Sequence, residues 1–209
     1  MNFMTQKSKI FSLFSIPVYL TRLNKNLSKK ELSFVNLIKN DVYKNEGNIT
    51  TNEGYVLERE VFKNLKNELN LIVQDYFNTV INATNDVVPY ITQSWLNYTE
   101  KDQFHHRHSH PNSLVSGVVY LAANKEFDKI KFFKRNTYQV IKPQINDWNE
   151  WNSESWWCSV STGDVLLFPS SLAHMVEYKK GDNTRISLAF NTFVKGKLGN
   201  YKDLTELKF

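Results

Sequence analysis

Four of the five histidines of this chain lie together in residues 105–110, and the fifth, His174, stands alone much further along. A neutral imidazole is the commonest protein ligand for iron, zinc or copper. His108 and His110 are two residues apart, and in an extended segment such residues point to the same side, so both rings can face one point. The sequence therefore predicts a metal site formed by His108, His110 and His174.

This arrangement is close to that of a non-haem Fe(II) oxygenase, which needs three protein ligands and leaves open positions for substrate and O₂. The usual version has a histidine, a carboxylate two residues later and a distant histidine. Here His110 stands at the carboxylate position. His106 shares a strand face with His108 and is the alternative ligand to His110. Surface or core histidines without a metal are the simpler interpretation, but they explain the close pair and its distant partner less well.

Arg185 is the second chemical signal, because it follows His174 at the start of another β-rich segment. A guanidinium is permanently charged and pairs with a carboxylate through two hydrogen bonds, so it suits the far end of a dicarboxylate. Ser187 lies on the same strand face and offers a hydroxyl donor. The alternative is a surface arginine in a salt bridge, which its position after His174 makes the weaker interpretation.

Short β-rich segments follow one another from about residue 90 onward. Asn, Gly, Pro and Asp separate them, as is typical of an antiparallel barrel or a double-sheet roll. His174 begins one of these strands and His108 and His110 precede another, so a roll can bring the three to one end. The predicted strands are 90–98, 114–121, 129–133, 156–160, 164–168, 174–178 and 185–194.

Helical patterning dominates the first ninety residues. Ser28 and Glu31 form a capping-box pattern that opens a helix through about Asn40. A longer helix is expected at residues 58–81, with one apolar stripe. The side chains expected to face the core are Leu32, Val35, Leu37 and Ile38 in the first helix, and Phe62, Leu65, Leu69, Ile72, Tyr76 and Val80 in the second.

The chain of 209 residues is interpreted as a single α+β domain. Residues 1–89 would supply an N-terminal edge strand at 11–20 and the supporting helices, with a loop at 45–54. Residues 90–194 would form the β core, and residues 195–209 a C-terminal tail.

Composition limits the cellular setting. Cys158 is the only cysteine, so no internal disulfide forms, and no apolar run is long enough for a membrane helix. The N-terminus lacks the pattern of a secretory signal, so we expect a cytoplasmic protein with no membrane partner. The net charge is +5, but the lysines are scattered, which argues against a nucleic-acid partner.

Three segments resemble a known family: residues 108–121, 163–174 and 185–191 (HSHPNSLVSGVVYL, GDVLLFPSSLAH and RISLAFN), with Ser94–Asn97 before them. They look like the 2-oxoglutarate/Fe(II)-dependent oxygenases of phages and marine bacteria. The resemblance implies a double-stranded β-helix, or jelly-roll, core that uses Fe(II), 2-oxoglutarate and O₂. For a phage-encoded protein, the location would be the host cytoplasm.

The prolyl hydroxylases of the wider superfamily extend this comparison. They carry a tyrosine ten residues before the first metal histidine, where Tyr98 stands, and another on the next strand, where Tyr120 stands. The resemblance implies that Tyr98, Tyr120 and Arg185 hold 2-oxoglutarate. Ordinary packing inside the roll is the alternative for both tyrosines. The departure from the pattern is His110, which makes the ligand set neutral.

Residues 134–157 are predicted to be a long connection rich in aromatic side chains, and such connections are often lids. Trp156 and Trp157 are expected to begin a strand and pack. Trp148 or Trp151 are the candidates to face the substrate, and Tyr138 lies in the same segment.

The sequence thus predicts a dioxygenase that hydroxylates a C–H bond and releases succinate and CO₂. The alternatives are a three-histidine, cupin-type dioxygenase that does not use 2-oxoglutarate, and a non-catalytic metal-binding or structural module whose histidines hold zinc or no metal. The substrate, a small molecule or a peptide, is not identified by the sequence. The oligomeric state is equally open, with a homodimer as one option.

Overall fold

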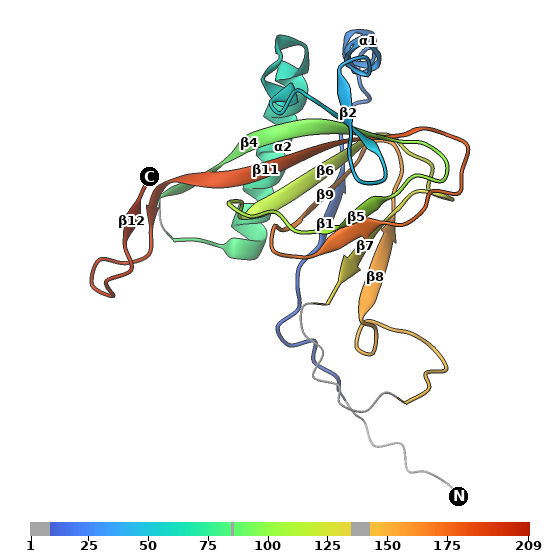
Figure 1. Cartoon of the computed structure of the whole chain (residues 1–209). Coiled ribbons are helices and arrows are strands. Elements are labelled where there is room, and N and C mark those ends of the chain that lie inside the picture. Colours follow the sequence, from blue (N-terminus) through green and yellow to red (C-terminus); the bar gives the residue numbers. More distant parts are fainter. Residues whose placement is uncertain (1–8, 85, 135–142) are drawn as a thin grey trace, which may run out of the picture.

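Two antiparallel sheets and a layer of helices make up the structure (Figure 1). A computed structural model describes residues 9–84, 86–134 and 143–209 of the protein. The major sheet has the strand order β1-β9-β6-β11-β4-β3-β2, with β12 paired to β11. Its strands are β1 (Tyr19–Arg22), β2 (Val42–Lys44), β3 (Ile49–Thr51), β4 (Val87–Thr99), β6 (Val115–Ala122), β9 (Asp164–Pro169), β11 (Arg185–Leu198) and β12 (Leu207–Lys208).

The minor sheet has the order β5-β10-β7-β8 and faces the inner side of the major sheet. Its strands are β5 (His105–His108), β7 (Lys129–Phe133), β8 (Ser155–Ser159) and β10 (His174–Val176). Side chains from the two sheets meet in a buried apolar cluster that includes Tyr120, Ile130, Phe132 and Phe168. This pair of sheets is the double-stranded β-helix that the sequence predicted, with an α+β arrangement overall.

The helices cover the other face of the major sheet (Figure 1). They are α1 (Lys29–Ile38) and α2 (Lys63–Tyr76), the latter preceded by two 3₁₀ turns, η1 (Val56–Glu58) and η2 (Glu60–Phe62), and followed by a π-helical turn, η3 (Phe77–Ile81). The Ser28 side chain accepts from the Glu31 backbone and the Glu31 side chain from the Ser28 backbone, so the predicted capping box is confirmed. Apolar side chains of the helices and of the sheet form the second, larger core.

Parts of the predicted helical pattern are wrong. Leu32 and Leu37 are exposed, because α1 packs through Phe34, Val35 and Ile38. Val80 is exposed as well, since the regular helix ends at Tyr76 and the π turn changes the direction of the residues that follow.

Several strand bounds also differ from expectation. Only the last part of residues 11–20 is a strand, and the predicted loop at 45–54 contains β3 of the β2–β3 hairpin. Strand β5 was not predicted. The last residues of the chain are not a free tail, because β11 continues to Leu198 and pairs with β12.

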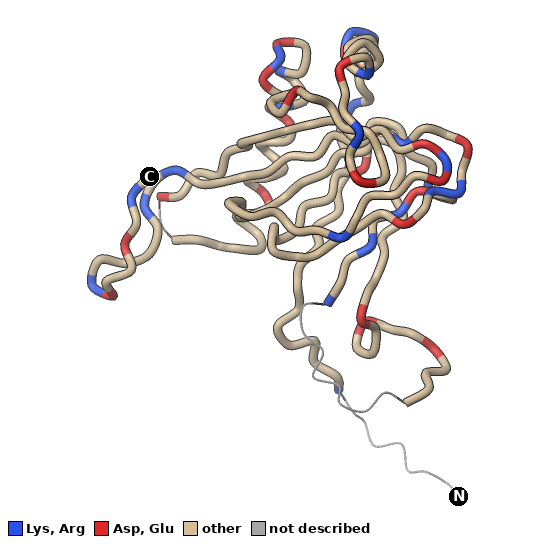
Figure 2. The backbone as a smooth tube through the Cα atoms, in the orientation of Figure 1, with Lys and Arg blue, Asp and Glu red and all other residues tan. Residues whose placement is uncertain are grey.

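Charged residues lie mainly on the helices and the loops at strand ends, where Lys and Arg alternate with Asp and Glu (Figure 2). The inner strands carry few of them in this view. No helix in the described parts of the chain is long and apolar enough to cross a membrane.

Candidate functional site

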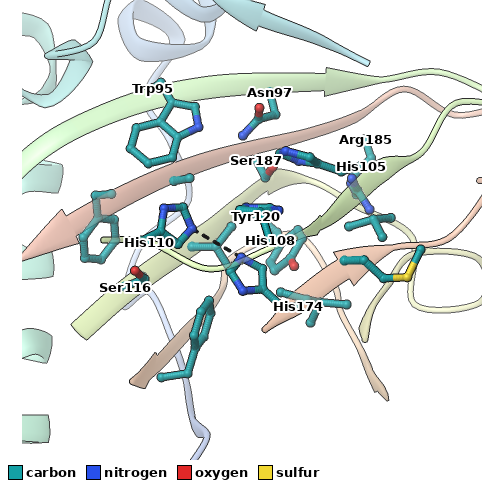
Figure 3. Close-up of a pocket in the computed structure, with 18 residues that line it drawn as sticks. Trp95, Asn97, His105, His108, His110, Ser116, Tyr120, His174, Arg185 and Ser187 are labelled. Carbon is teal, nitrogen blue, oxygen red and sulfur yellow. Dashed lines mark hydrogen bonds between the residues drawn. The ribbon is translucent and has the colours of Figure 1, made fainter. Parts of the chain in front are cut away.

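Three histidines converge at one end of the minor sheet (Figure 3). His108 ends β5 and His174 begins β10, and the two are direct partners in the antiparallel register. His110 follows β5, and its backbone N–H donates to the Ser170 carbonyl at 2.9 Å. One potential ligand atom from each ring lies within 4.8 Å of those of the other two. The predicted set is therefore brought together in space.

Hydrogen bonds fix which ring nitrogen of His108 and of His174 carries the proton. His108 Nδ1 lies 2.8 Å from the His106 carbonyl, and His174 Nδ1 lies 3.0 Å from the Leu172 carbonyl. A carbonyl only accepts, so both Nδ1 atoms are protonated and both Nε2 atoms keep a lone pair. His110 Nε2 and His174 Nε2 are 3.4 Å apart. A hydrogen bond from Nδ1 to a backbone carbonyl is a usual way in which a protein orients a metal-binding imidazole.

Burial keeps these imidazoles neutral. Burial, together with a smaller effect of neighbouring histidines, lowers the pKa of His110 to about 4 and that of His174 to about 3. The pKa of His108 is also lowered, mainly by burial. A metal binds the neutral imidazole, so the site need not release protons near pH 7. Three neutral nitrogen donors fit a divalent first-row metal such as Fe(II).

His106 is placed less favourably than His110. Its ring lies 5.0 Å from that of His108, and it forms a second group of close histidines with His105 and His108. However, the cavity is lined by His105, His108, His110 and His174 and not by His106, whose Nδ1 lies 3.8 Å from Glu46 Oε2. The geometry therefore favours His110 as the third ligand.

Arg185 reaches the same cavity from β11 and is 2% exposed. Its Nη2 donates to Thr99 Oγ1 at 3.0 Å, whereas Nε and Nη1 have no hydrogen-bond partner among the described residues. Buried polar groups are almost always hydrogen-bonded, and leaving one unpaired costs about 1–3 kcal/mol. Two orphaned donors on a buried cation therefore indicate the place of an anionic ligand.

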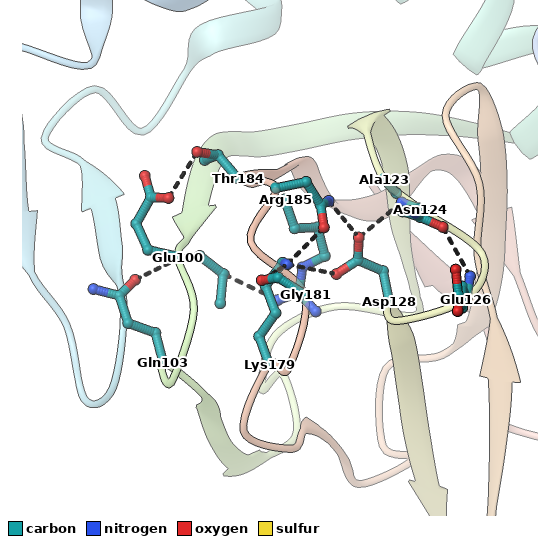
Figure 4. Close-up of polar contacts among 12 residues, drawn as sticks. Glu100, Gln103, Ala123, Asn124, Glu126, Asp128, Lys179, Gly181, Thr184 and Arg185 are labelled. Atoms are coloured by element: carbon teal, nitrogen blue, oxygen red, sulfur yellow. Dashed lines mark hydrogen bonds and ion pairs between the residues drawn. The ribbon is translucent and has the colours of Figure 1, made fainter.

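A buried polar network lies behind Arg185 (Figure 4). Lys179 Nζ donates to the Gly181 carbonyl at 2.6 Å and lies 3.9 Å from Asp128 Oδ1, with both side chains almost fully buried. Burial lowers the pKa of Arg185, while Tyr120 and the Asp128 carboxylate act in the opposite direction. The guanidinium therefore has negative charge nearby without being neutralised by a direct ion pair.

Ser187 and Tyr120 line the cavity beside Arg185; the position of Ser187 was expected from its strand face and that of Tyr120 from the family resemblance. Neither hydroxyl makes a hydrogen bond to a described residue. Burial raises the pKa of Tyr120, so its hydroxyl keeps its proton and is available as a donor. Arg185, Ser187 and Tyr120 thus present a group of donors to one space.

The prediction for Tyr98 is wrong. Its hydroxyl donates to the Val35 carbonyl at 2.6 Å, and its ring packs in the core beneath the helices. Successive residues of a strand point to opposite faces, so Asn97 and Trp95 face the cavity in its place. Asn97 is 4% exposed, and its Oδ1 accepts a hydrogen bond of 2.7 Å from Thr50 Oγ1. Alternation on the predicted strand 90–98 was the signal that could have found Asn97.

The predicted lid also differs from the structure. Trp151 and Trp156 line a separate groove beside residues 11–18, and Trp151 Nε1 donates to Ser12 Oγ at 3.3 Å. Trp148 is 62% exposed, and neither it nor Trp151 lines the histidine cavity. Trp157 does belong to a strand, β8, but remains half exposed. Tyr138 lies outside the described residues.

Comparisons with known proteins agree with this geometry. Residues 93–191 match the family model described as "Putative 2OG-Fe(II) oxygenase". A search of the curated proteins finds no match to the sequence.

Solved structures of similar fold include the following three proteins. HygX from Streptomyces hygroscopicus, solved with nickel, 2-oxoglutarate and hygromycin B, superposes with a TM-score of 0.58 at 15% identity, over 85% of this chain and 82% of that one. A prolyl-4-hydroxylase from Pseudomonas putida superposes with a TM-score of 0.53 at 12% sequence identity, over 85% of this chain and 93% of that one. A 2OG-Fe(II) oxygenase family protein from Burkholderia pseudomallei superposes with a TM-score of 0.51 at 14% sequence identity, over 83% of each chain.

The histidine cluster and the orphaned arginine lie inside the matched segment, on the fold that these enzymes share. Residues 93–191 therefore match the 2OG-Fe(II) oxygenase family model, on a fold shared with solved structures that include a 2OG-Fe(II) oxygenase family protein.

Proposed function

We propose that the protein hydroxylates a C–H bond of a small-molecule substrate, and that His108, His110 and His174 are its iron ligands. One observation carries the proposal. Three imidazoles with ligand atoms within 4.8 Å of one another share a cavity with a buried guanidinium that has two unpaired donors. When bound, Fe(II), 2-oxoglutarate and O₂ supply the oxidising chemistry, with release of succinate and CO₂.

Arg185 is assigned to the distal carboxylate of 2-oxoglutarate. Thr99 holds the guanidinium through Nη2, so Nε and Nη1 both keep N–H groups that are free to donate to a carboxylate. Because the group is buried, a charge-assisted hydrogen bond there is stronger than one in water. Ser187 and Tyr120 add hydroxyl donors from neighbouring strands.

The neutral ligand set has a consequence for binding. With His110 in place of a carboxylate, no protein charge offsets that of the metal. We expect stronger attraction for the dianionic co-substrate and weaker retention of the metal than in a site with one carboxylate ligand.

Apolar side chains enclose the histidines on the side of the minor sheet. The ring of Phe168 lies 4.7 Å from that of His174, edge to face, and Ile130 and Val118 line the same cavity. These side chains exclude water from the reacting groups, which strengthens electrostatic interactions inside the cavity and protects reactive species from side reactions.

The second candidate function is a three-histidine dioxygenase that needs no 2-oxoglutarate, and the histidine at position 110 is the observation in its favour. Such an enzyme would have no use for the two free donors of Arg185. The zinc-binding module is supported less, since its metal would need a fourth protein ligand to close the site.

The test is succinate formation by protein reconstituted with Fe(II) under anaerobic conditions and then given 2-oxoglutarate and O₂. We expect succinate from the wild-type protein and a loss of at least about tenfold in Arg185→Ala, a difference of about 1.4 kcal/mol. Arg22→Ala is the matched control, because the Arg22 side chain is 63% exposed, pairs with Asp164 and does not line the cavity. O₂ consumption that is independent of both 2-oxoglutarate and Arg185 would instead support the second candidate.

A further inference from the structure

An open cleft of about 310 Å³ leads to the histidines from the side of the β2–β3 hairpin. Its inner end is formed by His105, His108 and His110, which also line the inner cavity. Its walls come from the hairpin and from the exposed part of β4. Cavities of this size typically hold small organic ligands. The cleft is therefore the route by which a substrate would reach the proposed metal.

The chemistry of the lining is polar but uncharged. None of the described residues that line the cleft is Lys, Arg, Asp or Glu. A charged group placed there would lose part of its solvation without gaining an ionic partner among these residues, which is unfavourable. The inner cavity, in contrast, contains the unpaired guanidinium. Charge thus separates the two spaces: the inner one suits the anionic co-substrate and the outer one a neutral molecule.

Free hydrogen-bonding groups face this cleft. The amide of Gln93 and the hydroxyl of Tyr43 make no hydrogen bond to any described residue. Asn52 donates one amide hydrogen to Asp41 Oδ1 and keeps its own carbonyl oxygen available. Each of these groups can pair with a hydroxyl, which both donates and accepts.

Trp95 supplies a flat apolar surface next to them. Its ring is partly buried and lies 5.8 Å from that of His110, centroid to centroid (Figure 3). An indole face beside amide and hydroxyl groups suits a ring that is apolar on one side and carries hydroxyls at its edge, because each part then meets a matching surface.

We propose that the cleft binds a neutral, hydroxyl-bearing ring, that is, a sugar residue, which stacks on Trp95 and presents a C–H to the histidines. The inference rests on the proposed oxygenase function and names the class of its substrate. Gln93 and Trp95 are the residues that would select it.

The test uses saturation-transfer NMR on protein loaded with Zn(II), as a redox-inert replacement for iron, and with 2-oxoglutarate. The probes are the methyl glycosides of glucose, galactose and mannose, with glucosamine and glucuronate as charged counterparts and N-acetyl-prolinamide as a peptide. We expect at least one neutral glycoside to bind and its charged counterparts to bind at least about tenfold more weakly.

Variants connect the binding to the cleft. Gln93→Ala and Trp95→Ala should weaken glycoside binding at least about tenfold, with Trp95→Phe as a milder change if the alanine variant does not fold. Trp157→Ala is the matched control, because this half-exposed tryptophan lies outside the cleft.

Three results would overturn the proposal: no binding of any neutral glycoside, equal binding of glucosamine or glucuronate, or binding of the peptide in place of the sugars. Succinate release that depends on Arg185 is measured separately without any of these probes. If it persists while the glycosides fail to bind, the sugar assignment is wrong and the oxygenase function stands.

Discussion

The hydroxyl of Thr50 on β3 donates a hydrogen bond of 2.7 Å to the Oδ1 of Asn97 on β4. This bond orients the buried amide of Asn97, because only its Nδ2 hydrogens then remain to face the cavity. Asn97 thus presents donors to the space that also contains Arg185 and Ser187.

We therefore predict that Asn97→Asp raises the KM for 2-oxoglutarate by about tenfold or more, because it places a negative charge beside a dianion. Thr50→Val should have a smaller effect in the same direction, since it removes only the orienting bond. Thr50→Ser keeps the hydroxyl and is the control. The measurement is succinate formation against 2-oxoglutarate concentration; an unchanged KM in Asn97→Asp would show that the amide does not face the co-substrate.

Replacing Arg185 should make the protein without ligands more stable while it removes binding of 2-oxoglutarate. A buried guanidinium with two unpaired donors is destabilising, and an apolar side chain of similar length avoids that cost of about 1–3 kcal/mol. We expect Arg185→Met to raise the urea midpoint of the metal-free protein. A lower midpoint in this variant would mean that the guanidinium has partners that stabilise the folded state.

The metal-free protein should lose stability as the pH falls below about 6.5. Burial lowers the pKa of His110 to about 4, of His174 to about 3 and of His105 to about 2 in the folded state, whereas the unfolded chain has ordinary values near 6.5. Below pH 6.5 the unfolded chain therefore binds protons that the folded protein does not, which favours unfolding. Each group contributes up to about 1.4 kcal/mol per pH unit between its two pKa values.

Urea unfolding at pH 7.5, 6.5 and 5.5 measures this dependence. His110→Gln and His174→Gln should each make the decrease of the unfolding free energy toward pH 5.5 less steep. Equal slopes in the wild type and in both variants would show that these imidazoles titrate normally in the folded protein.

Metal retention should respond to charge at position 110. His110→Asp restores one carboxylate to the ligand set, so we expect slower loss of Fe(II) to a chelator together with weaker binding of 2-oxoglutarate. His106→Asp is the comparison, because His106 does not line the cavity. If the change at position 106 altered metal retention and the change at 110 did not, His106 would be the third ligand.

The β core was the part of the fold that the sequence predicted best. Strand β7 has the predicted bounds, because its apolar and polar residues alternate within a short segment. The convergence of His108 and His174 was predictable only as a consequence of the roll, since their direct pairing depends on the register of β5 against β10. Strand β5 itself has four polar residues and carries no apolar signal.

The error at Tyr98 has a simple physical origin. A spacing of ten residues before His108 was carried over from related enzymes, but a shift of one residue in a strand moves a side chain to the opposite face. The β4 register places Tyr98 under the helices and Asn97 in the cavity. Likewise, the aromatic content of residues 134–157 did not reveal which cavity Trp151 would line.

The central claim is that three imidazoles and Arg185 form one site for Fe(II) and 2-oxoglutarate. Its most direct test is an anaerobic titration of Fe(II)-loaded protein with 2-oxoglutarate, followed by visible absorption. We predict a charge-transfer band that saturates at one 2-oxoglutarate per iron, is absent in His174→Ala and needs much more 2-oxoglutarate in Arg185→Ala. A wild-type protein that binds Fe(II) but shows no band, or a band unaffected by either substitution, would contradict the account.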